Sequence, residues 1–135
     1  MNRLINSIQN FYYQEQIHFE MYDEDTLVVH QGLDNTNVRL NIVYFTNPDE
    51  EKNIQLKIYN LGKVDYISES LRKKVNELNQ KYRWYKIYFE DGDIVLSTDA
   101  IVTPNNVGDI CLELTIRGIN ICNAIYPELM RAIWG

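Results

Sequence analysis

The chain is poor in the residues that build metal sites and disulfide frameworks. It has two cysteines and two histidines among 135 residues. On one continuous helix, the eleven positions between Cys111 and Cys122 would separate them by roughly 16 Å, beyond the reach of about 7 Å between Cα atoms that a disulfide allows. No H-E-x-x-H or paired C-x-x-C spacing is present, so the sequence predicts no metal site. We interpret both cysteines as buried thiols, and His18 and His30 as ordinary structural residues.

The motifs of phosphate binding and nucleophilic catalysis are also missing. The glycines at positions 32, 62, 92, 108 and 118 are isolated, and no serine lies in a G-x-S-x-G context. Acidic clusters at residues 23–25, 49–51 and 90–93 fall in expected turns, where solvated carboxylates are common. We therefore predict a protein that is not an enzyme and has no cofactor.

Long apolar runs and an excess of positive charge are missing as well. Thirteen Lys and Arg residues stand against nineteen Asp and Glu residues, which gives a net charge of −6. Such a chain lacks the basic field that attracts nucleic-acid phosphates, and this argues against that class of partner. No stretch approaches the roughly 20 apolar residues of a membrane helix, and the N-terminus has no signal-like apolar run. We expect no membrane association and a cytoplasmic protein.

What the chain does contain is the composition of one globular domain. Hydrophobic residues make up 45% and charged residues 24% of the sequence. A chain of this length buries roughly two-thirds of its unfolded surface, so it needs neither a disulfide nor a metal to fold. We expect a single domain over residues 1–135.

Apolar periodicity predicts a helix and three strands in the first half. Residues 2–14 repeat apolar side chains at three- and four-residue spacing, which is typical of an amphipathic helix. Residues 17–22 are interpreted as extended but ambiguous, and residues 23–25 as a solvated turn. Alternation predicts strands at Thr26–His30, Val38–Thr46 and Asn53–Asn60. Their short connections make them an antiparallel meander.

The second half predicts a helix, a hairpin and a long final helix. The helix spans Asp65–Tyr82, with Asp65 or Ser68 as its N-cap. Strands at Trp84–Phe89 and Ile94–Thr98 flank Asp91-Gly92-Asp93, a strong hairpin signal. The final helix begins near Val107 and runs toward Trp134, and Pro127 should kink or end it.

The order of elements and four short features in the second half resemble a known family. These features are Leu78-Asn79, Gly92, Asp99 and Tyr126-Pro127. They resemble the YbjN-like family of small bacterial proteins, and the layout is also similar to the type III secretion chaperone fold. The resemblance implies an α+β fold, with a five-stranded antiparallel sheet and helices mainly on one face. Some YbjN-like proteins are described as sensory-transduction regulators, and chaperones of the similar fold are dimers that bind extended client segments.

One face of the expected sheet is unusually apolar for a solvated surface. Alternation turns Leu27, Val29, Leu40, Ile42, Leu56 and Ile58 toward the helices. The opposite face then receives Val28, Val43, Phe45, Tyr59, Tyr88 and Val95. These residues are either scattered apolar side chains, or covered by residues 17–22, or a contact surface for a partner.

A basic segment with interleaved aromatics lies between residues 72 and 86. Its cations are Arg72, Lys73, Lys74, Lys81, Arg83 and Lys86. The segment is interpreted as the solvated face of the second helix. The alternatives are contact with an acidic protein or weak nucleic-acid binding.

The final helix is apolar over more than half its circumference, so we expect it to be buried on two sides. Leu114, Ile121 and Ile125 are candidates for either core packing or a homodimer interface. From these features we expect a non-enzymatic interaction or regulatory module that binds a protein in a chaperone-like manner. The alternative is a small-molecule sensor or unrecognised enzyme that uses His18 or His30.

Overall fold

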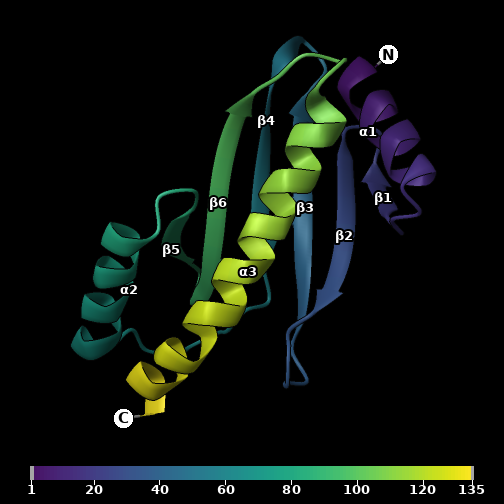
Figure 1. Ribbon diagram of the computed structural model, residues 1–135. Helices are drawn as coiled ribbons and strands as arrows, with labels where there is room; N and C mark the ends of the chain where they lie inside the picture. Colours follow the sequence, from purple (N-terminus) through teal and green to yellow (C-terminus); the bar gives the residue numbers. More distant parts are fainter. Residues whose placement is uncertain (1, 135) are drawn as a thin grey trace.

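The computed structural model describes residues 2–134, which form three helices and one antiparallel sheet of six strands (Figure 1). The elements in chain order are α1 Arg3–Gln14, β1 Glu20–Asp23, β2 Thr26–Gly32, β3 Arg39–Asn47, β4 Glu50–Tyr59, α2 Glu69–Lys81, β5 Lys86–Glu90, β6 Asp93–Ile101 and α3 Val107–Trp134. Neighbouring strands follow the order β1-β2-β3-β4-β6-β5.

The prediction of five strands is wrong by one, because β1 forms an edge strand beside β2. All four residues of β1 are exposed. A strand without a buried face leaves no apolar alternation in the sequence, and alternation was the signal that predicted the other strands. The β1–β2 pair is held by main-chain pairing in which Glu20 faces Val28, and its register shifts before Asp23.

Other boundaries differ from the predictions by a few residues. Helix α2 begins at Glu69 because Ser68, one of the two expected caps, accepts a hydrogen bond from the Leu71 N–H at 3.1 Å. The expected hairpin is confirmed: Glu90 pairs with Asp93 across a two-residue turn in which Asp91 and Gly92 both have positive φ.

Helix α3 does not end at Pro127, since it runs on to Trp134. Pro127 is exposed, and it lies two turns before the end of the helix. The hydrogen bond that it cannot donate is therefore lost on the solvent side, where water can satisfy the freed carbonyl. Among residues 2–134, none of the helices has both the length and the apolarity needed to cross a bilayer.

The core lies between the sheet and the helices. The six residues expected to face the helices are all buried: Leu27, Val29, Leu40, Ile42, Leu56 and Ile58. A chain of hydroxyls runs through this core, from Tyr12 on α1 to Tyr44 on β3 at 2.6 Å, and from Tyr44 to Thr115 on α3. It supplies partners for polar atoms that would otherwise be buried alone.

Helix α3 crosses the sheet diagonally, with α1 on one side of it and α2 on the other (Figure 1). Two glycines permit this close packing. A Cβ atom on Gly118 would lie 2.6 Å from Cδ1 of Ile58, and one on Gly108 would lie 2.6 Å from Cγ of Phe11. The two-sided burial expected for the final helix therefore comes from the sheet and the neighbouring helices.

Candidate protein-interaction surfaces

The outer sheet face is the face turned away from the helices, and it holds all six residues predicted to lie there. Val28, Val43, Phe45, Tyr59 and Tyr88 are half-buried, and Val95 is fully buried. The helices of the described chain pack into the core on the opposite face. Strand β1 extends the sheet at its edge and does not lie over this face. The apolar side chains of the outer sheet face are therefore shielded mainly by one another.

Lys57, which the sequence analysis did not single out, lies at the centre of the outer sheet face. Its Nζ lies 5.9 Å from the ring centroid of Phe45 and 5.8 Å from that of Tyr88. These are cation–π distances, and the aliphatic stem covers part of the apolar surface. The alternation of β4 could have revealed this position, because Lys57 lies between Leu56 and Ile58, which face the core.

The surroundings of Lys57 favour its charged form. The Tyr88 side chain is the largest influence that raises the pKa of Lys57, with smaller contributions from Tyr59 and Glu90, and these outweigh the opposing effect of partial burial. The Oε2 atom of Glu90 lies 3.5 Å from Nζ as an ion pair without a hydrogen bond. Burial also raises the pKa of Tyr59. The outer sheet face thus presents a fixed positive charge framed by aromatic rings.

A shallow hollow of about 410 Å³ lies on the same face next to β1. His30 is held in it by Asn41, whose Oδ1 lies 2.7 Å from Nδ1, and its Nε2 lies 3.4 Å from Oε2 of Glu20. The rest of the lining comes from Met21, Tyr22, Val28, Val43 and Tyr59. The hollow therefore joins a histidine, a carboxylate and apolar side chains at one place. His18 is exposed elsewhere, in the segment that follows α1.

The cationic side chains of the predicted basic segment, residues 72–86, point in several directions. Arg72 and Lys73 line a second shallow hollow beside Phe89. The Nζ atom of Lys74 lies 3.2 Å from Glu77 on the same helix and 3.7 Å from Glu128 on α3. Lys81, Arg83 and Lys86 are exposed, and Nζ of Lys86 lies 5.7 Å from the Tyr88 ring. The segment is not one continuous cationic surface.

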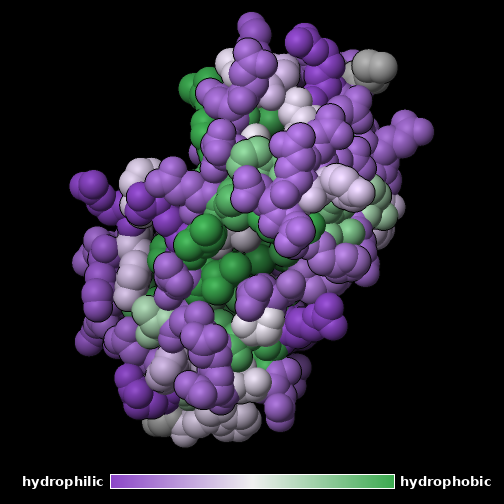
Figure 2. Space-filling view, turned by 45° about the vertical axis from the view of Figure 1, so that its right-hand side comes forward, coloured by the Kyte–Doolittle hydropathy of each residue, from purple (hydrophilic) through white to green (hydrophobic). Residues whose placement is uncertain are grey.

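The three predicted α3 residues face the core. Leu114, Ile121 and Ile125 are at most 8% exposed in the single chain, so they take the core role of the two alternatives. In the middle of α3, three apolar residues reach the surface: Leu112 and Ile119, which are half-buried, and Ile116, which is 50% exposed. We call these three the α3 flank. Figure 2 shows that hydrophobic side chains form a band on one face of the molecule, between hydrophilic ones.

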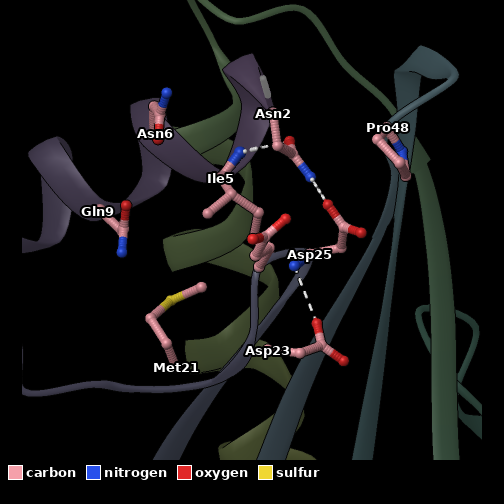
Figure 3. Close-up of a pocket in the computed structure, with 9 residues that line it drawn as sticks. Asn2, Ile5, Asn6, Gln9, Met21, Asp23, Asp25 and Pro48 are labelled. Atoms are coloured by element: carbon pink, nitrogen blue, oxygen red, sulfur yellow. Dashed lines mark hydrogen bonds between the residues drawn. The ribbon is translucent and has the colours of Figure 1, made fainter.

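In the hollow beside the N-terminus of α1, Asn2, Asp25 and Asp23 are joined by hydrogen bonds (Figure 3). The Oδ1 of Asn2 accepts a hydrogen bond from the Ile5 N–H at 3.0 Å, and its Nδ2 donates to Oδ1 of Asp25 at 2.9 Å. The Asp25 N–H in turn donates to Asp23. These bonds fasten α1 to the β1–β2 turn, which is a structural role.

The two cysteines lie buried in the core. Burial raises the pKa of both Cys111 and Cys122 to about 12, so neither is a thiolate at neutral pH. Within residues 2–134, no group of three or more His, Cys, Asp and Glu side chains is arranged to hold a metal ion.

Comparison with known proteins gives a likeness of fold. No family model matches the chain, and no curated protein matches it by sequence. Among solved structures, the chain is similar to one in the crystal structure of the ExsC–ExsE complex, with a TM-score of 0.57 and 12% identity over 92% of this chain and 91% of that one. At this identity the likeness concerns the fold alone. It supports the chaperone-like α+β fold expected from the sequence and leaves the YbjN-like family unsupported.

Proposed function

We propose that this chain is a non-enzymatic protein-binding module and that its outer sheet face is the binding surface. The observation that carries the proposal is the apolar and aromatic character of a sheet face that no helix of residues 2–134 covers and that is partly open to solvent. Solvated sheet faces are normally polar, and exposed apolar groups that lie together mark contact sites. The similar fold in the ExsC–ExsE complex comes from a complex of two proteins, which agrees with a protein-binding role.

The order of side chains on this face suggests how a partner would be held. Val28, Val43 and Lys57 are adjacent across β2, β3 and β4 in the register of the sheet. A partner would bury the two valines and meet the Lys57 charge between its aromatic rings. Aromatic residues and partly desolvated charges are typical of the residues that dominate binding energies.

The test is partner capture with a matched pair of variants. Val43→Asp places a charge in the centre of the face, and Asn120→Asp places one on an exposed position of α3. We expect a protein captured by the parent chain and by Asn120→Asp to be lost with Val43→Asp. Circular dichroism must first show that both variants are folded. A folded Val43→Asp chain that still captures the same protein would contradict the proposed surface.

Small-molecule sensing is a second candidate, and the His30 hollow favours it. A ligand there would meet the imidazole, the Glu20 carboxylate and the apolar lining described above. A thermal-shift screen with the parent chain should then find a stabilising compound whose effect disappears in His30→Ala. If the same compound also stabilises His30→Ala, it binds elsewhere.

Three more specific expectations from the sequence are also proposals: a homodimer, membership of the YbjN-like family and weak nucleic-acid binding. A homodimer is supported by the α3 flank, and sedimentation of Ile116→Asp against the parent chain tests it. Membership of the YbjN-like family, with its regulatory description, depends on the four second-half features alone. Weak nucleic-acid binding through residues 72–86 is the least supported alternative, because the cations there point in several directions.

A further inference from the structure

The two edges of the sheet end in different ways. Strand β1 forms one edge and β5 the other. An edge strand presents main-chain N–H and C=O groups that can pair with another chain, and proteins usually block such edges. The four residues of β1 are exposed, whereas helix α2 lies alongside β5 (Figure 1). Among the elements of residues 2–134, a helix therefore closes the β5 edge and not the β1 edge.

A single amide side chain makes the closure. The Nδ2 of Asn79 donates to the Ile87 carbonyl at 2.8 Å, and the Ile87 N–H donates to Oδ1 of Asn79 at 2.7 Å. In an antiparallel pair, two facing residues exchange these same two hydrogen bonds. The Asn79 amide therefore takes the place of a residue of a seventh strand. It binds the outward-facing main-chain groups of Ile87, the second of the five residues of β5.

The segments that precede or contain the two edge strands differ in charge, although β5 itself also ends on Glu90. Residues 15–25, which contain β1, include Glu15, Glu20, Asp23, Glu24 and Asp25, and no Lys or Arg. Residues 81–86, which lead into β5, include Lys81, Arg83 and Lys86, and no Asp or Glu. The acidic β1 edge of one copy is thus complementary to the basic segment 81–86 of another. Such a contact is heterologous, so it would repeat from copy to copy and not close into a pair.

We propose that Asn79 is an edge guard: it occupies the β5 main chain and thereby prevents head-to-tail pairing with the β1 edge of a second copy. This role is separate from the binding of a partner by the outer sheet face. Asn79 blocks pairing by hydrogen bonding to the Ile87 main chain and carries no charge. In the parent chain, the acidic β1 edge of one copy and the basic segment 81–86 of another therefore still attract each other. Removal of the amide frees the Ile87 N–H and C=O groups for another partner.

Sedimentation velocity of the full chain across a dilution series tests the proposal. Asn79→Ala removes both hydrogen bonds, and Asn76→Ala is the matched control, because Asn76 is exposed on the same helix. We expect Asn79→Ala to form larger species that grow with concentration and shrink as salt is added, since salt screens the edge charges over about 10 Å at 0.1 M. Asn76→Ala should sediment like the parent chain. Amide exchange at Ile87 should rise in Asn79→Ala only.

A double variant separates edge pairing from aggregation through unfolding. In Asn79→Ala with Glu20→Lys, the acidic edge is weakened, and association should fall back toward that of the parent chain. Association that persists unchanged in the double variant would overturn the proposal. So would an Asn79→Ala chain that sediments like the parent, whether or not its Ile87 amide exchanges faster. Asn79→Gln, which keeps an amide that is one methylene too long to make both bonds, should behave like Asn79→Ala.

Discussion

Replacement of Gly118 by alanine should destabilise the protein even though alanine favours helices. In a helix interior the change from glycine gains about 1 kcal/mol. The new methyl group would lie 2.6 Å from Cδ1 of Ile58 and 2.7 Å from the Tyr85 hydroxyl. Overpacking of this kind costs about 1–3 kcal/mol. The Tyr85 hydroxyl also donates to the Leu114 carbonyl at 2.7 Å, and loss of that bond costs about 1 kcal/mol more.

The sum is a net loss of about 1–3 kcal/mol in the free energy of unfolding, measured by urea denaturation followed by circular dichroism. Gly32→Ala is the control, because a Cβ atom there would meet nothing within 4 Å. It should change the free energy by no more than about 0.5 kcal/mol. A Gly118→Ala protein that is as stable as the parent chain, or more so, would refute the close packing of α3 on β4.

Three further predictions follow from the core and the N-terminus. Leu114→Asp should abolish folding as judged by circular dichroism, because it buries an unpaired charge, whereas Ile116→Asp at a half-exposed position should remain folded. Burial raises the pKa of both thiols from 9.0 to about 12, so this contribution to stability is complete below pH 9 and is lost as the pH rises toward 12. Urea unfolding at several pH values should show this fall, and a Cys111→Ala, Cys122→Ala double variant should show less of it. Asn2→Ala should cost about 1 kcal/mol by the same assay through loss of the α1 N-cap, and more if the Asp25 contact contributes.

Elements with one buried face could be predicted from the sequence, and those without one could not. Alternation placed Leu40, Ile42 and Tyr44 on one face of β3 because that face is buried. Strand β1 buries none of its residues, so its sequence carries no such pattern. Pro127 was expected to kink or end α3. The helix continues because the lost hydrogen bond lies on the solvent side, which only the packing of α3 reveals.

The candidate binding surfaces could also be predicted from the sequence only in part. The six residues of the outer sheet face followed from alternation, but the position of Lys57 over two rings depends on the register of β4 against β3 and β6. The contact of Asn79 with Ile87 spans eight positions in sequence. It required the angle at which α2 returns to β5, which no local pattern specifies. The resemblance in four short features of the second half indicated the order of helices and strands. It did not indicate the contacts of Lys57 or of Asn79.

The hydroxyl chain of Tyr12, Tyr44 and Thr115 restricts how the layers can be assembled. Apolar stripes on helices tolerate sliding, since one turn of leucines and isoleucines packs much like the next. Displacement of α1 or α3 by one turn would leave a core hydroxyl without a partner, at a cost of about 1–3 kcal/mol for each. That penalty is comparable with the differences that separate competing packings of a small core. Three hydroxyls therefore act together with the close contacts at Gly108 and Gly118 to favour one alignment of the two helices on the sheet.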